Sequence, residues 1–363
     1  MDATVTRNVL SRAPALRLAH LQALLKAAGG ELERALEPHV IREIDLPPAT
    51  REHLTSPDTT ACRMDVEWMN ASGARLILGT EPGYPRQLAQ IGNAPVALFV
   101  LGDPDVLSSL QISIVGSRNP THGGRATAHD FAANLASAGL TITSGLAVGI
   151  DAASHEGALL AGGRTVAVCG TGLDEVYPPR HANLARRIRE RGALVSEFPP
   201  RTRPRRENFP RRNRLIAGLA AGTLVVEAAL HSGSLTTARL AAKQGRKVLA
   251  IPGSIRNPLA RGCHELIRDG AALVEDATQV LSELNFPLTG EALAATPRPV
   301  GSRRPLDKPY EMLLDALALE SATVDLLAER TGLPCESIAS MLLILELEGR
   351  VAPQSGGRYS PLF

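Results

Sequence analysis

Residues 201–214, with the sequence RTRPRRENFPRRNR, contain seven arginines, one acidic residue (Glu207) and one aromatic residue (Phe209), although the formal net charge of the whole chain is only +2. Arginine binds phosphate oxygens bidentately, and a nucleobase can stack on an aromatic ring. This arginine segment is therefore predicted to bind single-stranded nucleic acid. The alternative is a solvated charged loop, which the single sign of the charges and the aromatic residue disfavour.

Phe209 has two interpretations of its own. Its ring stacks on a base, or it fills the core beneath Leu215, where an apolar helical run begins. Pro210 stiffens the segment and so reduces the entropy lost on binding. The arginine segment is predicted to lie just before this helix.

Glycine loops follow three apolar runs and have the sequences VGSRNPTHGGR, SGLAVGID and CGTGLDEVYP. In the first loop, Gly116 and Ser117 allow a tight turn, and Arg118 adds a cation suited to phosphate. None of the loops has the pattern G-x-G-x-x-G or G-x-x-x-x-G-K-[ST], and we expect no cofactor. Gly170 and Gly172 of the third loop are predicted either to form tight turns or to contact a ligand.

A second anion-binding loop is predicted where Glu227 ends an apolar run and a helix opens soon afterwards. The start of this helix contains Ser232, Gly233, Ser234 and Thr236. Such residues hold a phosphate or cap the helix, and both alternatives stay open. Asp151, at the end of the second glycine loop, is predicted to be a structural helix N-cap because its charge would repel a phosphate.

Metal and nucleophile chemistry is not predicted. His155, His181 and His231 have no carboxylate or cysteine at a spacing typical of a metal site or a triad, so they are predicted to be ordinary surface or turn histidines. The four cysteines form no C-x-x-C pair, which disfavours a zinc knuckle or a disulfide framework and favours a reducing cytoplasm; they are Cys62, Cys169, Cys263 and Cys335.

The elements that must position these loops alternate regularly. The apolar runs typical of buried strands are ISIVG, LTITSG, TVAVCG, ALVSEF, GTLVVEA and KVLAIPG. Amphipathic helical stretches separate them. The alternation predicts an α/β fold, a Rossmann-like parallel sheet with helices on both faces. Ligands bind such a sheet at the carboxyl ends of its strands, so we expect the glycine loops and the arginine segment at one edge.

The chain of 363 residues divides into four regions. Residues 1–79 are predicted to form a small helical (SAM-like) accessory domain, 80–286 a Rossmann-like DNA-binding domain, and 287–305 a linker rich in Pro, Gly and Ala. Residues 306–363 contain three helical runs and a Gly-rich end, which is typical of a winged helix. No run approaches the roughly 18 apolar residues of a membrane span, and no signal peptide is evident, so we expect a cytoplasmic protein.

Seven stretches together resemble the DprA family of DNA-processing proteins, also called Smf; they are IVGSRNPTHGG, SGLAVGIDAASHEGAL, TVAVCGTGLDEVYPPRHANLA, SEFPP, NFPRRNRLIAGL, VVEAALHSGSLTTARLA and AIPGSIRNPLARGCHELIRDGA. The resemblance implies a Rossmann-like domain that forms a homodimer and binds single-stranded DNA. It also implies that the protein is no enzyme but protects incoming DNA and loads the recombinase RecA in natural transformation and DNA recombination.

The arginine segment and the resemblance together predict the residues that contact DNA, namely Gly116, Ser117, Arg118, Arg205, Arg206, Asn208, Phe209, Arg211, Arg212, Asn213 and Arg214. Lys243 and Lys247 are expected at the edge of the same groove. One departure concerns the first helices, which the family often joins by a glycine hairpin of the P-G-L-G kind. This chain has APALR there, so we expect the helical domain to be accessory and not to grip DNA.

Two other functions are considered. Nucleoside monophosphate hydrolases have a similar fold; Glu227 beside SGSLTTA supports this alternative, and the absence of a P-G-G-x-G-T loop opposes it. A sequence-specific regulator would use the C-terminal helix-turn-helix. However, residues 306–363 have four basic and nine acidic residues, a net charge of −5, and the second helix, CESIASMLLILELEG, offers no Arg, Lys, Asn or Gln for base contacts. This unit is therefore predicted to contact protein: a partner, the other subunit, or the protein's own basic groove, where it would act as a DNA mimic.

Overall fold

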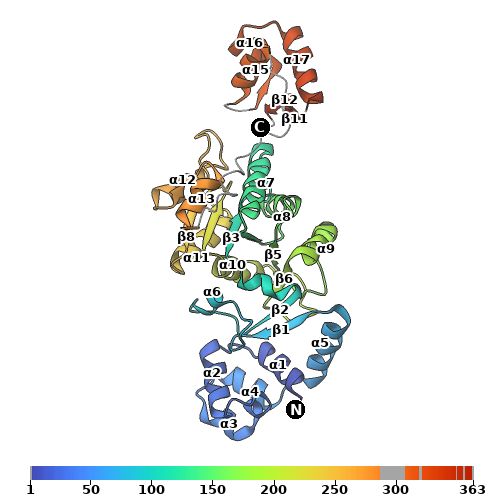
Figure 1. The fold of residues 1–363 in the computed structure, drawn as a ribbon, viewed down its shortest axis with the longest axis vertical. Helices are drawn as coiled ribbons and strands as arrows, with labels where there is room; N and C mark the ends of the chain where they lie inside the picture. Colours follow the sequence, from blue (N-terminus) through green and yellow to red (C-terminus); the bar gives the residue numbers. More distant parts are fainter. Residues whose placement is uncertain (1, 287–306, 319–320, 349, 355, 362–363) are drawn as a thin grey trace.

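A nine-stranded sheet forms the centre of the molecule, with the strand order β1-β2-β6-β5-β4-β3-β7-β8-β9 (Figure 1). The structure is a computed structural model and describes residues 2–286, 307–318, 321–348, 350–354 and 356–361. The strands from β6 to β9 in this order are parallel. Strand β2 pairs antiparallel with both β1 and β6, so the sheet is mixed at one end only.

The predicted apolar runs form six of the parallel strands: β3 (Gln111–Val115), β4 (Thr141–Ser144), β5 (Thr165–Val168), β6 (Ala193–Ser196), β7 (Gly222–Val225) and β8 (Lys247–Ala250). The others are β1 (Arg75–Leu78), β2 (Ala97–Gly102) and β9 (Ala272–Leu273). Every residue of β3 to β7 is buried. Because both faces are covered, these strands have no exposed side that would require polar residues at alternate positions.

Helices cover both faces of the sheet. One face carries α7 (His122–Ser137), α8 (Ile150–Leu160), α9 (Ala182–Arg191) and α13 (Ala277–Glu283). The other carries α6 (Arg86–Ala89), α10 (Asn208–Leu219), α11 (Gly233–Lys243) and α12 (Arg261–Arg268). Ile112 and Ile114 of β3 pack on the α7 side, whereas Val115 packs on the α10 side, as alternation along a strand requires. Short 3-10 turns, η2 (Pro104–Ser108) and η3 (Pro179–His181), lie in the connections.

The sheet is doubly wound about β3 and β7, which are neighbours in its middle. From β3 the chain continues through β4, β5 and β6 toward one edge, and from β7 it continues through β8 and β9 toward the other. The predicted Rossmann-like class is therefore confirmed. The carboxyl ends of β3 and β7 form the switch point at which such sheets bind ligands.

The N-terminal helices share an apolar core with one end of the sheet. They are α1 (Ala3–Arg12), α2 (Leu18–Ala27), the 3-10 turn η1 (Leu32–Leu36), α3 (Pro38–Glu43), α4 (Pro48–Thr55) and α5 (Thr59–Ser72). Leu10, Leu21 and Leu24 belong to the same buried cluster as Phe99 of β2 and Leu184 of α9. Figure 1 shows these helices (blue) against β1 and β2.

Residues 75–78 form strand β1 at the edge of the sheet, although they fall within the range 1–79 that is predicted to form the helical domain. Helix α5 ends at Ser72, and Gly73 caps it with a φ of 76°. Arg75 to Leu78 then pair with β2. Three buried residues in a row follow the exposed Arg75, so the strand lacks the alternation that would have revealed it. The predicted boundary after residue 79 therefore assigns a strand of the sheet to the helical domain.

The turn between α1 and α2 contains Ala15 with a φ of 54°, in the left-handed region that favours glycine. This is the place where the sequence has APALR instead of a glycine hairpin. The turn therefore keeps a glycine-like backbone without glycine.

The C-terminal unit has the order expected of a winged helix. Its helices are α15 (Lys308–Ala318), α16 (Val324–Thr331) and α17 (Cys335–Leu347), and its strands are β10 (Ala322–Thr323), β11 (Val351–Gln354) and β12 (Arg358–Pro361). The strands form an antiparallel sheet in the order β10-β12-β11 around a small apolar core. Gly332 ends α16 with a φ of 70° and makes the predicted helix-helix turn. The predicted linker, 287–305, lies outside the described residues.

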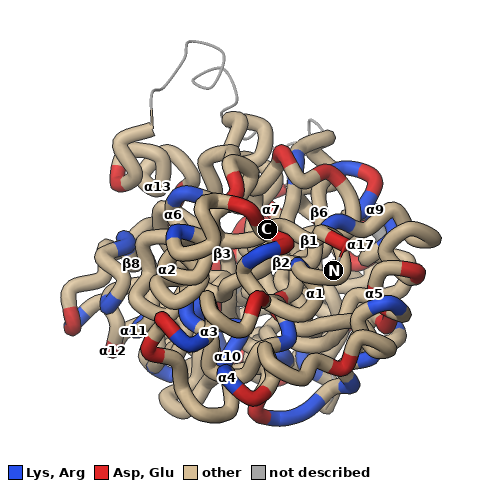
Figure 2. The backbone as a smooth tube through the Cα atoms, turned by 90° about the horizontal axis from the view of Figure 1, so that it is seen from below, with Lys and Arg blue, Asp and Glu red and all other residues tan. Residues whose placement is uncertain are grey.

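Acidic and basic residues are spread over the tube of the backbone instead of gathering on one side (Figure 2). In the described part of the chain, no helix is both long enough and apolar enough to span a bilayer. All four cysteines carry free thiols. Burial raises the pKa of the Cys62 thiol and of the Cys169 thiol to about 11 each.

Candidate nucleic-acid interface

A pocket of about 760 Å³ opens at the switch point. It brings together three segments that are far apart in the sequence: the loop after β3, the start of α10 and the start of α11. Among its lining residues are the predicted site residues Gly116, Ser117, Arg118, Arg206, Phe209, Arg212, Asn213, Ser232, Gly233 and Ser234. This co-localisation is the arrangement that the sequence predicted for the edge of the sheet.

The loop after β3 is held tightly at its base. A Cβ atom on Gly116 would lie 2.6 Å from Ile150 Cγ1 and 2.9 Å from the carbonyl oxygen of Glu227, so glycine is required. The Ser117 amide donates to that same carbonyl at 2.6 Å. Arg118 follows with an exposed side chain. A fixed backbone and a cation at its tip make a phosphate contact geometrically simple.

Helix α11 points its N-terminus at the same pocket. Ser232 is the N-cap and accepts from the Ser234 amide at 3.3 Å, and the two hydroxyls lie 2.7 Å apart. The capping role is therefore confirmed. Both serines also line the pocket, where the partial positive charge of the helix end favours an anion. Thr236 is exposed outside the pocket, and Thr237 lines it instead.

Phe209 forms part of the pocket wall together with Tyr177. Their ring centroids are 5.5 Å apart and their planes meet at 42°. A Cβ atom on Gly170 would lie 2.9 Å from Phe209 Cδ1, so the ring packs against the glycine loop after β5. Phe209 is thus half-buried at the surface, while Leu215 is fully buried in the core. Phe209 is therefore not a core plug beneath Leu215, and stacking on a base stays a prediction.

Sequence analysis missed Tyr177, which is 43% exposed and lines the pocket. The signal was available, because aromatic residues make up only 3% of the chain and this one ends a glycine loop after an apolar run. The pocket therefore has two aromatic rings, one from the glycine loop after β5 and one from the first turn of α10. Single-strand binders use such rings as stacking surfaces.

Helix α10 begins at Asn208, inside the arginine segment, and not after it as predicted. Pro210 is the third residue of the helix, where its missing N–H removes no intrahelical bond. Asn208 does not line the pocket; its side chain donates to the Gly170 carbonyl at 3.1 Å and ties α10 to the glycine loop. Only part of the arginine segment therefore faces the pocket.

Arg212 lies at the floor of the pocket and is only 4% exposed. Its Nη1 donates to the carbonyls of Gly145 and Val168, at the ends of β4 and β5. Burial lowers the pKa of Arg212, and the nearby Asp151 carboxylate raises it. Arg212, which was predicted to contact DNA, therefore links the ends of β4 and β5 through its hydrogen bonds.

Arg214 and Arg211 turn away from the pocket toward Glu197 in the loop after β6. Arg214 Nη2 lies 2.5 Å from Glu197 Oε2, and Arg211 Nη2 lies 3.0 Å from the same oxygen. The Arg211 guanidinium also lies 5.3 Å from the centre of the Phe198 ring. Arg214 is buried, and this burial lowers its pKa. Neither residue lines the pocket.

The two lysines predicted at the groove edge lie at the opposite edge of the sheet. Lys247 is the first residue of β8 and pairs with Glu283 at 3.0 Å, whereas the pocket lies at the carboxyl ends of the strands. Lys243 is the last residue of α11, whose first residues line the pocket. Arg205 is exposed outside the pocket lining, and Gly172 packs tightly against Asp174 and Pro199.

Two carboxylates near the site have structural roles. Glu227 is 7% exposed, and its carboxylate accepts three hydrogen bonds. The donors are the Thr121 backbone amide (2.8 Å), the Thr121 hydroxyl (2.7 Å) and the Asn257 side-chain amide (3.3 Å). Glu227 does not line the pocket. Asp151 lines the pocket but is not the predicted N-cap, because Gly149 precedes α8. It accepts from the Gly145 and Ala147 amides, and burial raises its pKa.

The three histidines differ. His155 is completely buried, contrary to prediction; its Nδ1 lies 2.7 Å from the Thr165 hydroxyl, and burial lowers its pKa to about 3. His181 contacts the Leu146 carbonyl at 2.9 Å, and His231 lines the pocket. Among the described residues, no group of three His, Cys, Asp or Glu side chains is placed to hold a metal ion.

A doubly wound sheet with a pocket at its switch point defines the class of Rossmann-like proteins, which bind ligands at this edge of the sheet. The family model of the DNA recombination-mediator protein A matches residues 75–285, and that of the DprA winged helix domain matches residues 295–357. The chain belongs to the DNA recombination-mediator protein A (DprA) family, as the sequence motifs predicted.

The relatives agree with this assignment. Protein Smf of Escherichia coli (strain K12) is 44% identical over 296 residues, which cover 80% of this chain and 78% of that protein. The X-ray structure of DNA processing protein A from Streptococcus pneumoniae superposes with a TM-score of 0.68 at 34% identity and covers 80% of this chain and 100% of that one. DNA processing protein A from Helicobacter pylori, whose structure describes a single-stranded DNA binding mode, has a TM-score of 0.53 at 28% identity and covers 58% and 95%.

Proposed function

We propose that the switch-point pocket binds single-stranded DNA. The observation that carries this proposal is the convergence of Arg118, Arg206 and the Phe209–Tyr177 ring pair on one pocket. Phosphates would contact Arg118 and the N-terminus of α11, and bases would stack on the two rings. The Helicobacter pylori relative, which binds single-stranded DNA, supports this assignment.

The pocket is expected to bind without marked sequence preference. Arg203, Arg205 and Arg206 precede α10 with exposed side chains, as Arg118 does on the neighbouring loop. Four phosphate contacts at about −0.7 each give a slope of about −3 for log affinity against log salt. Fluorescence anisotropy with a labelled oligodeoxythymidylate at several salt concentrations measures this slope. A salt-independent affinity, or equal affinity for a duplex of the same length, would sink the proposal.

The wider role follows from family membership. We infer that the protein acts in the cytoplasm as a homodimer, protects incoming DNA and loads RecA onto it in natural transformation and DNA recombination. Sedimentation equilibrium tests the dimer. RecA loading is tested by the lag before RecA hydrolyses ATP on DNA coated with single-strand-binding protein, which this protein should shorten.

The second candidate, a nucleoside monophosphate hydrolase, requires a carboxylate at the ligand. The structure gives Glu227 three hydrogen bonds to protein groups and places it outside the pocket lining. We therefore favour a binding protein without turnover. Incubation of the pure protein with AMP and other nucleotides tests this choice, and release of free base at enzymatic rates would reverse it.

A further inference from the structure

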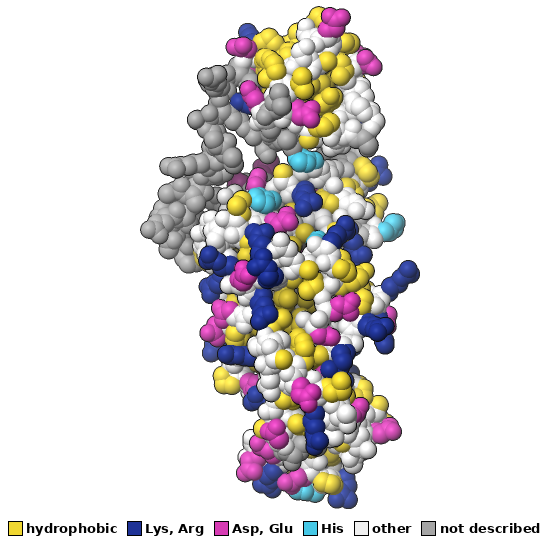
Figure 3. Space-filling model, turned by 90° about the vertical axis from the view of Figure 1, so that its right-hand side faces the viewer, with side chains coloured by type: hydrophobic (Ala, Val, Ile, Leu, Met, Phe, Trp, Pro, Cys, Tyr) yellow, Lys and Arg dark blue, Asp and Glu magenta, His cyan; other side chains and the backbone are white. Residues whose placement is uncertain are grey.

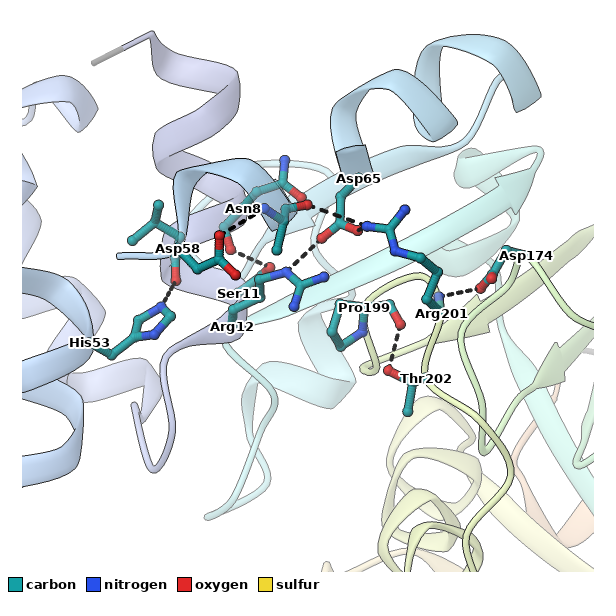
Figure 4. Close-up of polar contacts among 12 residues, drawn as sticks. Asn8, Ser11, Arg12, His53, Asp58, Asp65, Asp174, Pro199, Arg201 and Thr202 are labelled. Atoms are coloured by element: carbon teal, nitrogen blue, oxygen red, sulfur yellow. Dashed lines mark hydrogen bonds and ion pairs between the residues drawn. The ribbon is translucent and has the colours of Figure 1, made fainter. Parts of the chain in front are cut away.

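The first residue of the arginine segment does not face the pocket. Figure 4 shows the Arg201 side chain reaching toward Asp65 on α5, which belongs to the N-terminal helices. Its Nη2 lies 2.5 Å from Asp65 Oδ1 and donates to the Ala61 carbonyl at 3.3 Å. One residue of the arginine segment is therefore committed to a protein contact.

Asp65 is held from two sides. It is completely buried, and its second oxygen, Oδ2, accepts from Arg12 Nε at 2.6 Å. The carboxylate thus joins α1, α5 and the arginine segment (Figure 4). A buried carboxylate with both oxygens paired keeps its partners in place, because releasing one of them leaves charge in a dry site.

The backbone of Arg201 is fixed as well. Its φ is 65°, a left-handed conformation that is uncommon for a residue with a side chain. Its amide donates to Asp174 Oδ1 at 2.7 Å, and the next carbonyl, of Thr202, accepts from the Gly172 amide at 2.9 Å. Arg201 therefore also anchors the glycine loop after β5.

The two segments that carry the rings of Tyr177 and Phe209 both start near the contact between Arg201 and Asp174. Tyr177 follows Asp174 by three residues, and Phe209 follows Arg201 by eight. The two rings meet at the pocket. A shift of Arg201 would thus move the start of both segments that carry the rings.

Helix α5, which carries Asp65, is itself held in place by contacts with the sheet region. Arg189 of α9 donates to the Ser72 carbonyl at 2.8 Å, so a second arginine from the sheet region reaches the end of the same helix. Cys62 and Met69 of α5 belong to the apolar core that the N-terminal helices share with β2 and α9. The link from Asp65 to the pocket therefore starts from a packed element.

We propose that the N-terminal helices contribute to single-strand binding without touching DNA: Asp65 holds Arg201 and thereby sets the position of the Phe209–Tyr177 pair. The proposal rests on the proposed function of the pocket. The physical effect is preorganisation, since ring segments that are already in place lose less entropy when a strand binds. Asp65 and Arg201 are positioning residues in this scheme.

The Asp65→Asn variant separates an electrostatic effect from a positioning effect, because the two predict opposite changes in DNA affinity. If electrostatics alone mattered, removing an acidic charge and releasing Arg201 would tighten DNA binding. If Asp65 positions the rings, the released loop must be ordered on binding, and we expect the Kd for labelled oligodeoxythymidylate to rise about fivefold. Asp58→Asn is the matched control: it removes one carboxylate at the start of the same helix, but the asparagine can still cap it. This variant should bind as the unchanged protein does.

Arg201→Ala tests the same link from the other side and leaves Asp65 paired with Arg12. The Arg201 side chain is 41% exposed, so the variant is expected to fold. A phosphate contact would flatten the salt slope by about 0.7, whereas a positioning residue lowers affinity and leaves the slope unchanged. The double variant should bind no more weakly than Arg201→Ala alone, because both changes break one link.

The outcomes separate cleanly. An unchanged protein that fails to bind the oligonucleotide overturns the proposed function itself. Normal binding with equal or tighter binding by Asp65→Asn, or a flattened slope in Arg201→Ala, overturns the positioning proposal only. Trp68, the one tryptophan of the chain, lies on α5. Its fluorescence reports whether that helix stays docked. If Asp65→Asn does not fold, the affinity and slope of Arg201→Ala decide the question.

Discussion

The switch-point pocket and the C-terminal unit each have one property of a DNA-binding site. The pocket has the chemistry, with arginines and two rings, on a fold whose many relatives bind other ligands. The C-terminal unit has the shape, a helix-turn-helix with a wing, but a net charge of −5. Shape alone therefore does not assign a DNA contact, because a groove-reading helix must also carry suitable side chains.

The surface of α17 shows this most directly. Its exposed side presents Leu343 (58% exposed) and Ile344 (43% exposed), where a recognition helix would have basic or amide side chains. Figure 3 shows hydrophobic side chains gathered on one face of this unit, at the top, with acidic residues around them. We propose that the unit contacts protein. The following predictions test this contrast.

The largest effect on DNA binding is expected at the pocket. Phe209→Ala should weaken binding of the oligonucleotide by roughly 1–3 kcal/mol, because one stacking surface is lost. The salt slope should stay the same, since no charge is removed. Anisotropy gives the affinity, and a thermal melt is the control. A large loss of Tm with little loss of affinity would mean that the ring is part of the core after all.

A stability effect of about 2 kcal/mol should distinguish the two regions by pH. Burial lowers the pKa of His155 to about 3 from its ordinary 6.5, so the unfolded chain binds more protons between these values. His155 therefore destabilises the sheet region by about 1.4 kcal/mol per pH unit as the pH falls below 6.5, or about 2 kcal/mol by pH 5. The C-terminal unit contains no histidine.

Calorimetry of the full chain between pH 7 and pH 5 measures this difference. The transition of the sheet region should move to lower temperature, and His155→Gln should reduce the pH dependence of its unfolding free energy. A variant with an unchanged pH dependence would contradict the burial argument. The C-terminal transition serves as the internal control.

A smaller effect is expected for Arg118→Ala. The variant should bind about fivefold more weakly at low salt and flatten the slope of log affinity against log salt by about 0.7, the share of one phosphate contact. Lys247→Ala is the matched control, because it removes one charge at the other edge of the sheet. Equal effects of the two variants would show that only total charge matters.

The smallest effect is expected when the C-terminal unit is removed. Deletion of residues 306–363 removes five net negative charges, so affinity for single strands should be unchanged or slightly higher. Anisotropy and circular dichroism of the shortened chain test this. A loss beyond about tenfold, with the sheet region folded, would show that α17 touches DNA.

The sheet was predicted well from the sequence because buried parallel strands consist of short apolar runs. Six such runs form β3 to β8. The prediction failed at strand β1, whose short apolar run of three residues follows helix α5 so closely that it is also compatible with a helix end. The start of α10 was hidden because proline and clustered arginines are atypical of a helix, although the first turn tolerates both.

The site was predicted in composition but not in orientation. Charge in a sequence does not tell which way a side chain points, and so Arg214, Lys243 and Lys247 were placed in a groove that they do not reach. The sequence marks Tyr177 as a rare aromatic residue at the end of a glycine loop, but only the fold shows that its ring meets Phe209. Buried partners such as Glu197 decide these orientations, and they come from other segments of the chain.

The core shared by the N-terminal helices and the sheet determines where the chain can be divided. A fragment that began near residue 75 would lose Leu10, Leu21 and Leu24, and it would turn the apolar sides of β2 and α9 toward water. Such a fragment should aggregate, because contiguous exposed apolar surface attracts other copies. The helices and the sheet should instead melt in one cooperative transition. Cutting after residue 286, beyond helix α13, should instead leave a smaller piece that keeps this shared core intact.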